Sequence, residues 1–543
     1  MGEGVGAGAI DGLMQPWPLT VDKLITHAAR WHAGREIVSR AADGAVSRTT
    51  YAELATRARQ FSAAPLACGI RPGDRVATLA MNGARHLEAW FGIMGIGAVC
   101  HTLNPRLPDA QLAYIVNHAS DRWLIADPAF APIVARLRPL CAALERVVYF
   151  AADGDDSYER LIGGRAADAP WGGFGEHTAA GLCYTSGTTG HPKGVLFSHR
   201  SNVLHTLITS QASAIGLTAV DTILMVVPMF HANAWGIPFS AAAAGAKLVL
   251  PGPRLDGASL YELLESEAVK FSAAVPTVWQ VLLDHLRANR LGLSTLKTVL
   301  IGGSACPETL IRDFRDAYGV EVLHAWGMTE MSPVGTVGAL TPAVAALNAE
   351  ARVAYALKQG HVPFGVDMKI TGEDGADLAH DGARSGYLQV RGPCVVQRYF
   401  GRDERDVAAA DGWFDTGDIG NIDTYGYLQI TDRAKDLIKS GGEWISSVEI
   451  ENVAAGHPKA LLAAVIAIPH PKWRERPLLI VKLRPGESAT REEFLGFLEG
   501  RIAHWWMPDE VVFVDDMPLG ATGKLDKKRL RVLYATAPAH PAA

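Results

Sequence analysis

The stretch KFSAAVPTVWQVLLDHLRANRLGLSTLKTVLI, residues 270–301, decides the fold class. Apolar runs of strand length at 270–275 and 296–301 flank residues 277–289, whose apolar side chains recur at helical spacing. A helix at 307–318, with Pro307 in its first turn, and a strand at 321–325 follow. Strands joined through helices pair in parallel by right-handed crossovers. We therefore expect a layered α/β fold, and residues 75–102 repeat the pattern.

Length and charge narrow the class of protein further. The chain has 543 residues, which at roughly 150 residues per domain suggests two to four structural units. With 51 Lys and Arg against 57 Asp and Glu, its formal charge of −6 offers no basic field for nucleic acid. The first twenty residues lack the basic start of a signal peptide, and the apolar stretch 234–246 is too short for a membrane span. We expect a cytoplasmic protein with no nucleic-acid partner and no membrane span.

The pattern changes along the chain. A segment rich in Gly, Asp and Ala at 151–179 and an Ala-rich segment at 341–358 break this pattern and predict loops or subdomain boundaries. Beyond about residue 435, expected helices at 446–455 and 490–505 alternate with expected strands at 460–468, 478–483 and 510–514. This predicts a separate compact α+β unit of about 100 residues.

The string YTSGTTGHPKG, residues 184–194, is the most informative for chemistry. Glycines let backbone N–H groups approach a phosphate, while the hydroxyls and Lys193 add donors and a positive charge. It is not a Walker A loop, because Lys193 is followed by Gly194 and an expected strand at 195–199 instead of a helix. We expect a phosphate-binding loop between two strands; the alternative is an ordinary polar hairpin.

This loop resembles the phosphate loop of the adenylate-forming superfamily, which includes acyl-CoA synthetases, firefly luciferases and the adenylation domains of nonribosomal peptide synthetases. Other strings match motifs of that superfamily in the same order. They are PMFHANAWG at 228–236, GGSA at 302–305, HAWGMTE at 324–330, GWFDTGD at 412–418, DRAKD at 432–436, SGGEWI at 440–445 and GATGK at 520–524. The similarity covers residues 20 to 530, and within the superfamily the chain is most similar to fatty acyl-CoA synthetases and 3-methylmercaptopropionyl-CoA ligases.

The resemblance implies a fold and a reaction. The fold has a large N-terminal domain of layered, mostly parallel sheets with helices and a small β-barrel-like subdomain (1–432), a hinge at 433–436 and a mobile α+β C-terminal domain (437–543). The reaction is the Mg²⁺-dependent joining of an apolar carboxylic acid, such as a fatty acid or 3-methylthiopropionate, to AMP with release of pyrophosphate. Transfer of the acyl group to coenzyme A follows. A homodimer is one assembly that the resemblance allows.

The resemblance also implies the site residues. For ATP they are Thr185, Ser186, Gly187, Thr188, Thr189, Gly190, Lys193, Gly302, Gly303, Ser304, His324, Ala325, Trp326, Gly327, Met328, Thr329, Asp418, Ile430, Arg433 and Lys524. For the acyl group and CoA they are His231, Trp235, Gly302, Lys439, Gly441, Gly442, Glu443 and Trp444. Glu330 and Thr185 would hold the metal, Lys435 would be the hinge, and Lys524, His231 and Thr185 would be catalytic.

Several of these residues have simpler explanations from the sequence alone. The alternative explanation of Glu330 is a solvated loop carboxylate, that of Trp326 is a core aromatic, and that of Asp418 is the cap of a turn. His231 reads equally as a buried structural histidine. For Lys435 the alternative is the start of a solvated helix, and for Lys524 it is a surface lysine.

Two positions depart from the pattern of the superfamily. Tyr387 stands where a glutamate is usual, which predicts that a structural ion pair is missing. Residues 473–476 are basic and aromatic, which favours either contacts with the CoA phosphates or a solvated loop.

Three other functions remain alternatives. A luciferase-like oxygenase would adenylate its substrate in the same way and then consume oxygen. A ligase that loads a carrier protein is less favoured because we expect no attached carrier domain, and a non-enzymatic nucleotide sensor is the simplest alternative.

Overall fold

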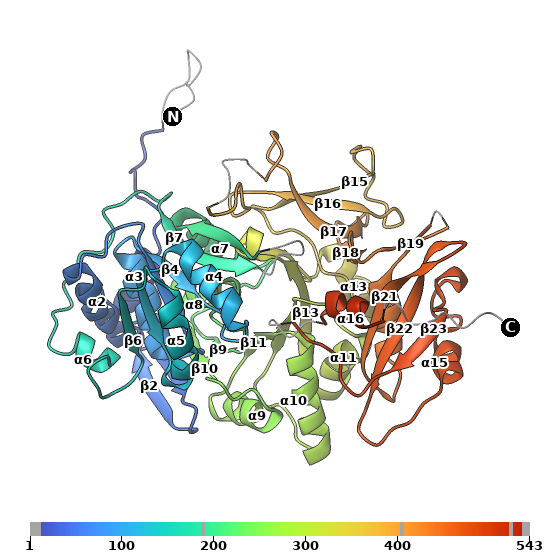
Figure 1. Ribbon diagram of the computed structural model, residues 1–543, viewed down its shortest axis with the longest axis horizontal. Coiled ribbons are helices and arrows are strands. Elements are labelled where there is room, and N and C mark those ends of the chain that lie inside the picture. Colours follow the sequence, from blue (N-terminus) through green and yellow to red (C-terminus); the bar gives the residue numbers. More distant parts are fainter. Residues whose placement is uncertain (1–11, 186–190, 402–406, 442, 521–524, 535–543) are drawn as a thin grey trace, which may run out of the picture.

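The computed structural model describes residues 12–185, 191–401, 407–441, 443–520 and 525–534. Its strands form sheets of eight, six, four and five strands (Figure 1). The helices are α1 (Asp22–Trp31), α2 (Tyr51–Ala67), α3 (Ala84–Gly95), α4 (Asp109–Ala119), α5 (Ala131–Leu137), α6 (Tyr158–Ile162), α7 (His199–Thr209), α8 (Ile237–Ala244), α9 (Gly257–Ser266), α10 (Pro276–Asn289), α11 (Glu308–Arg312), α12 (Pro342–Ala345), α13 (Ala349–Ala356), α14 (Ser447–Ala455), α15 (Arg491–Leu498) and α16 (Lys527–Tyr534).

The eight-stranded sheet contains the stretch that decides the fold. Its order is β14 (Val334–Val337), β13 (Glu321–Gly327), β12 (Thr298–Ile301), β11 (Phe271–Ala274), β9 (Thr222–Met225), β10 (Lys247–Leu250), β1 (Glu36–Arg40) and β2 (Val46–Thr50). Strands β11, β12 and β13 pair in parallel, as the alternation of strands and helices predicts. The helix expected at 307–318 is only partly correct. Pro307 is the N-cap residue, one position before α11 begins, and residues 313–317 form a π-helix.

The six-stranded sheet carries the expected phosphate loop. Its order is β6 (Arg146–Tyr149), β5 (Trp123–Ala126), β3 (Arg75–Leu79), β4 (Val99–Thr102), β7 (Ala179–Thr185) and β8 (Lys193–Ser198). The last two strands are antiparallel, with Thr185 opposite Lys193. The loop therefore connects two paired strands, as expected, although His199 already begins α7 instead of ending the strand.

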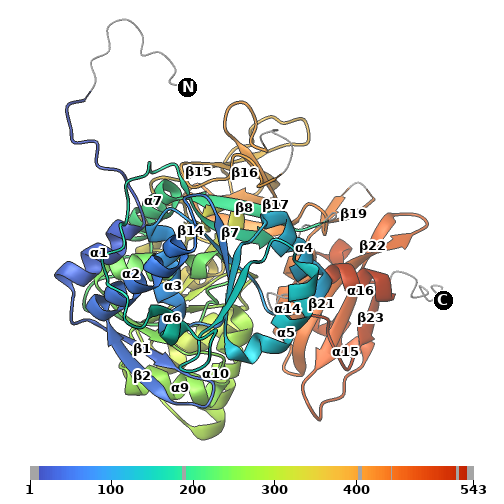
Figure 2. The ribbon, with the colours of Figure 1, turned by 60° about the vertical axis from the view of Figure 1, so that its left-hand side comes forward.

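Helices α3 and α8 join these two sheets into one core, and Figure 2 shows α3 beside α1 and α2. Every residue of α3 from His86 to Gly95 is buried, which is the pattern of a helix enclosed on all sides. One apolar cluster includes residues of both helices together with Ile37 and Val76, which lie on strands of different sheets. The layered α/β architecture is thus confirmed.

The four-stranded sheet corrects one expectation. It has the order β15 (Asp367–Thr371), β16 (Gly386–Arg391), β17 (Phe414–Ile422) and β18 (Leu428–Arg433), with antiparallel neighbours. Among the described residues β15 and β18 are its two edges, so this subdomain is an open sheet and no closed barrel. Four strands are too few to close around packed side chains, since small barrels need about eight.

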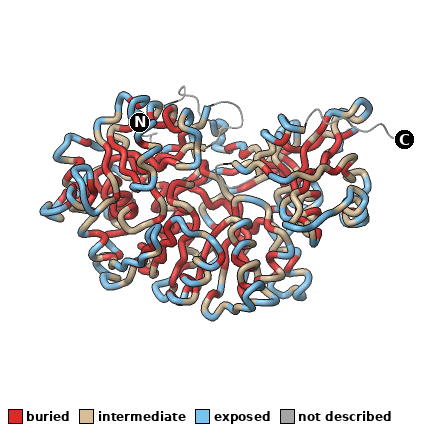
Figure 3. Tube along the Cα trace, turned by 60° about the horizontal axis from the view of Figure 1, so that its bottom comes forward, coloured by how far each residue is buried: buried red, intermediate tan, exposed pale blue. Residues whose placement is uncertain are grey.

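The C-terminal part is a smaller α+β unit with its own core (Figure 3). Its sheet pairs β20 (Glu443–Ile445), β19 (Ile438–Ser440), β22 (Arg474–Leu483) and β21 (Ala460–His470), and β23 (Glu510–Phe513) pairs with β22. The helix expected at 490–505 ends at Leu498, two residues before Gly500, whose φ is +71°. Residues 341–358, expected as a loop, hold α12 and α13, each begun by a side-chain cap.

None of the helices that the structure describes is both long enough and apolar enough to cross a membrane.

Candidate active site

Hydrogen bonds hold the two strands on either side of the phosphate loop to neighbouring segments. Tyr184 Oη and His118 Nδ1 share a hydrogen bond of 2.6 Å, which ties the end of β7 to α4. On the other side, Phe400 N donates to Gly194 O at 2.9 Å. Residues Ser186, Gly187, Thr188, Thr189 and Gly190 lie outside the described residues, so their expected contacts with phosphate stay predictions.

Glu330 and Lys193 meet at a tyrosine that the sequence did not single out. Tyr399 Oη donates to Glu330 Oε1 at 2.9 Å, and Lys193 Nζ lies 4.8 Å from the centre of the Tyr399 ring. Glu330 is 7% exposed, so its interpretation as a solvated loop carboxylate is wrong. The expected phosphate lysine and the expected metal ligand therefore contact the same tyrosine.

Asp418 collects two donors from separate elements. Trp326 Nε1 donates to Asp418 Oδ2 at 2.8 Å, and Arg433 Nε approaches Asp418 Oδ1 at 2.7 Å. Asp418 is 2% exposed and does not cap a local turn; Asp415 does so instead, by accepting from Gly417 N. The alternative explanation of Asp418 is therefore wrong, whereas that of Trp326 as a core aromatic is confirmed, because it packs with Met331 and Met368.

His324 is a buried residue of β13 in the same region. It is 1% exposed, its Nδ1 shares a hydrogen bond of 3.0 Å with Leu357 O, and burial lowers its pKa to about 4. The ring is therefore neutral at pH 7 and serves to position β13. The expected neighbours Gly303 and Ser304 follow β12, Ala325, Gly327, Met328 and Thr329 lie on or after β13, and Ile430 lies on β18.

The expected acyl-site residues lie on an unusual turn. Residues 232–236 all have positive φ, from 43° at Ala232 to 74° at Gly236. A run of non-glycine residues in this conformation is strained, and such strain is typical of functional sites. The turn is held by Asn233, whose Nδ2 donates to Asn202 Oδ1 at 3.3 Å and whose Oδ1 accepts from the thiol of Cys183.

Trp235 and Gly302 are brought together, as the expected acyl site requires. A Cβ atom on Gly302 would lie 3.3 Å from Trp235 Cη2 and 3.0 Å from Ala325 O. Trp235 is 8% exposed, and His231, half-buried, begins the turn. The indole ring therefore lies directly against the end of β12.

The antiparallel pair of β19 and β20, called here the C-terminal hairpin, contacts the four-stranded sheet. Trp444 meets Tyr387 edge-on with ring centres 6.0 Å apart, and Lys439 Nζ lies 3.4 Å from Glu373 Oε1. Tyr387, which replaces the usual glutamate, thus makes an aromatic contact between the two parts of the chain. Gly441 lies against Trp473 and Trp505, Glu443 is exposed, and Gly442 lies outside the described residues.

The segment after β18 is a turn. Residues 434–436 connect β18 to β19 without helical structure, so the alternative that Lys435 begins a helix is wrong. Asp436 pairs with Arg531, and Lys527 Nζ lies 2.8 Å from Glu451 Oε1 and donates to Ser447 Oγ at 2.7 Å. Both cations lie on α16, which follows the residues that include Lys524; Lys524 itself lies outside the described residues.

Part of the basic segment at 473–476 is structural. Arg476 is 8% exposed and donates to Asp509 Oδ1, Trp505 O and Met507 O at 2.8 to 2.9 Å. All three guanidinium nitrogens donate hydrogen bonds within the protein. Neither contact with the CoA phosphates nor a solvated loop therefore describes Arg476.

Three residues of the site were missed by sequence reasoning. Tyr399, His118 and Asn233 act through contacts with residues 69, 66 and 31 positions away. Only Asn233 had a local signal, because it lies within the motif at 228–236 and asparagine tolerates positive φ.

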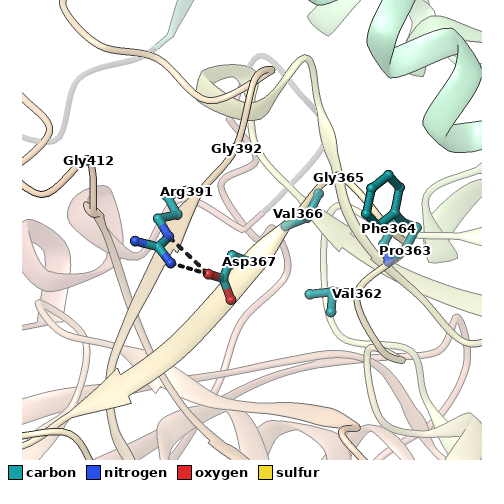
Figure 4. A pocket seen from close by; sticks show the side chains of 9 residues that line it. All are labelled: Val362, Pro363, Phe364, Gly365, Val366, Asp367, Arg391, Gly392 and Gly412. Atoms are coloured by element: carbon teal, nitrogen blue, oxygen red, sulfur yellow. Dashed lines mark hydrogen bonds and ion pairs between the residues drawn. The ribbon is translucent and has the colours of Figure 1, made fainter. Parts of the chain in front are cut away.

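A separate depression of about 600 Å³ lies beside β15 and β16 (Figure 4). Its lining includes the exposed Phe364 and the ion pair in which Arg391 Nη2 lies 2.7 Å from Asp367 Oδ2. None of its lining residues belongs to the site described above.

These observations define a layered α/β protein in which residues expected to bind a nucleotide come from three different sheets, and comparison with known families shows which family it belongs to. The AMP-binding enzyme family matches residues 25–400, and the AMP-binding enzyme C-terminal domain matches residues 449–524. The chain belongs to this family.

Individual relatives are similar over nearly their whole length. A 3-methylmercaptopropionyl-CoA ligase of Ruegeria lacuscaerulensis is 48% identical, covering 96% of this chain and 98% of that protein. A medium-chain-fatty-acid–CoA ligase of Ectopseudomonas oleovorans is 46% identical, covering 96% and 97%. The anthranilate CoA ligase AuaEII, solved with anthranoyl-AMP, has a TM-score of 0.86 at 22% identity over 96% of this chain and 98% of that one, which supports the fold.

Proposed function

We propose that this protein is an ATP-dependent acyl-CoA ligase that activates an apolar carboxylic acid as its acyl-adenylate and then transfers the acyl group to CoA. The observation that carries the proposal is a pair of contact sets, which contain the expected phosphate, metal and ribose residues and include Trp326 and Glu330, four positions apart on β13 and directly after it. Lys193 lies over Tyr399, Tyr399 binds Glu330, and Glu330 follows Trp326, which binds Asp418. Groups suited to phosphate, a metal and ribose thereby lie on or directly after β8, β13 and β17, which belong to three different sheets.

In the first step, a carboxylate oxygen attacks the α-phosphorus of ATP and the bond to the bridging oxygen breaks, releasing pyrophosphate. Both reactants are anions, so catalysis depends on positioning and on neutralising charge. Lys193 and the donors of residues 185–190 would bind the phosphates. Asp418 would accept hydrogen bonds from the ribose hydroxyls, and His324 would hold β13 in place.

Magnesium fits the residues around Glu330. A single buried carboxylate, with the Thr185 hydroxyl, suits an ion that takes one or two protein ligands and completes its shell with phosphate oxygens and water. No group of three or more His, Cys, Asp or Glu among the described residues could hold a metal alone. When bound with ATP, Mg²⁺ would neutralise charge on the phosphates.

In the second step, the CoA thiolate attacks the acyl carbon and AMP leaves. We assign the ATP and acyl sites to residues 1–432, the hinge to 433–436 around Lys435, and a rotating unit to 437–543. Lys524 would serve adenylate formation, and the hairpin with Lys439, Gly441, Gly442, Glu443 and Trp444 would replace it for thioester formation. His231 would orient the acid or the thiol.

The acid is proposed to be uncharged beyond its carboxylate, because Trp235 and its neighbours are apolar and buried. The names of the two relatives, one for a methylthio acid and one for medium-chain fatty acids, support a short or medium apolar acid. We place the enzyme in the cytoplasm, and a homodimer is the assembly to test by light scattering.

The test is pyrophosphate release across a panel of carboxylic acids with ATP, Mg²⁺ and CoA. We expect release that depends on an apolar acid, and AMP formation that depends on CoA under nitrogen, which a luciferase-like oxygenase would not give. A Lys524→Ala variant should lose ATP–pyrophosphate exchange while still forming thioester from supplied acyl-adenylate. No acid-dependent release with any acid would refute the proposal.

A further inference from the structure

The Trp326–Asp418 hydrogen bond has a geometry that an adenine-stacking role alone does not require. Trp326 comes from β13 and Asp418 from β17, 92 residues later in another sheet, and the bond joins them at 2.8 Å. Both residues are buried, Trp326 at 9% and Asp418 at 2% exposure. A buried carboxylate is costly unless its oxygens are satisfied, so this donor matters for where the carboxylate points.

Of the two donors, Trp326 is the rigid one. Its ring packs in a cluster with Met331, and a Cβ atom on Gly335 would lie 2.8 Å from Trp326 Cζ3, so the indole lies tightly against the backbone of β14. The side chain of Arg433, the last residue of β18, is 44% exposed and lies two residues before Lys435. The direction of the Asp418 carboxylate is therefore set by the indole N–H.

We propose that Trp326 is a positioning residue for ribose: its N–H fixes Asp418 so that the remaining lone pairs face the ribose hydroxyls. This inference rests on the proposed function, because it takes Asp418 to be the group that binds ribose. Each carboxylate oxygen accepts more than one hydrogen bond, so the contact with Trp326 leaves room for a hydroxyl.

The experiment compares ATP with 2′,3′-dideoxy-ATP in pyrophosphate release. Losing a hydrogen bond to a charged group changes an equilibrium by roughly ten- to a hundredfold. For Trp326→Phe we expect KM for ATP to rise about tenfold, with kcat within about twofold of the wild type. KM for 2′,3′-dideoxy-ATP should stay unchanged, because that nucleotide has no hydroxyl for Asp418 to bind.

Two further variants sharpen the test. Trp326 replaced by the isosteric 3-benzothienylalanine removes only the N–H and should give the same pattern if Trp326→Phe fails to fold. Trp413→Phe is the matched control, since Trp413 lies in the same part of the chain but contacts Arg391 and Lys369, and it should change neither KM. In an Asp418→Asn background, Trp326→Phe should add little further loss.

An equal rise in KM for both nucleotides would overturn the inference, because it would indicate stacking on adenine or general damage to the site. Unchanged KM for ATP in the benzothienylalanine variant would overturn it as well. Failure of the proposed function is distinguishable, because the wild-type protein would then release no pyrophosphate with any acid.

Discussion

The contact between Gly302 and Trp235 makes the substitution Gly302→Ala informative. Gly302 follows β12 directly, and its φ is not in the left-handed region, so alanine is tolerated by the backbone. The added Cβ would lie 3.0 Å from Ala325 O and 3.3 Å from Trp235 Cη2, closer than ordinary van der Waals contact. Ala325 is held by its pairing with Val337, so the indole must yield.

The size of the effect follows from this crowding. Overpacking of a buried site typically costs about 1–3 kcal/mol. A shift of the Trp235 ring by a few tenths of an ångström would narrow the acyl site, and misplacements approaching 1 Å cost up to about a hundredfold in rate. We therefore expect kcat/KM for the acid to fall by about ten- to a hundredfold, most for the longest acids, while KM for ATP changes little.

The assay is pyrophosphate release with a series of straight-chain acids, alongside thermal unfolding. Gly292→Ala is the control, because a Cβ there meets nothing within 4 Å. In the double variant Gly302→Ala/Trp235→Ala, the clash with the ring is gone and only the contact with Ala325 O remains, so activity should partly return and longer acids should be accepted. A Gly302→Ala enzyme with wild-type kcat/KM for every acid would refute the reasoning.

Three further predictions concern stability, coupling of the two parts, and nucleotide binding. Burial lowers the pKa of four histidines, to about 4 for His86 and His324 and to about 3 for His199 and His205. Their neutral forms stabilise the fold fully above pH 6.5, and this contribution is lost as pH falls from 6.5 toward about 3, because the unfolded chain binds protons first. The guanidinium chloride midpoint should therefore drop between pH 7 and pH 5, and a constant midpoint would contradict this. Tyr387→Ala removes the aromatic pair with Trp444, which contributes about 0.5–1.5 kcal/mol. The rate of thioester formation relative to adenylate formation should therefore rise about two- to tenfold. The control Tyr425→Ala should leave this ratio unchanged, and an unchanged ratio in Tyr387→Ala would exclude coupling through this contact. Lys193→Met should raise KM for ATP at least about tenfold and leave KM for the acid unchanged, and the reverse pattern would place Lys193 outside the phosphate site.

Local pattern was a reliable guide to the parallel strands. The strands at 271–274, 298–301 and 321–327 follow from short apolar runs separated by helical spacing, because each of these signals depends only on neighbouring residues. The antiparallel strands on both sides of the phosphate loop follow for the same reason. The helices within 341–358 were missed, although the segment is rich in Ala, which favours helices, and Thr341 and Asn348 each cap one.

Residue by residue, the site was less predictable. Residue types and motif order identified Glu330, Asp418 and Trp326, but Tyr399, which joins Lys193 to Glu330, belongs to no motif that the sequence made visible. Tyr387 looked like a lost ion pair, whereas it contacts Trp444 from the C-terminal part.

The sequence by itself determined the fold class and the family and supplied the residues proposed for a nucleotide site, since these depend on periodicity and on the order of short motifs. Only the tertiary structure decided that Trp326 donates a hydrogen bond to Asp418, and that Trp235, on a turn of residues with positive φ, lies against Gly302. It also decided that the four-stranded sheet stays open. The physical reason is that these contacts join residues tens of positions apart, and their geometry depends on how separate sheets pack, which local spacing does not encode.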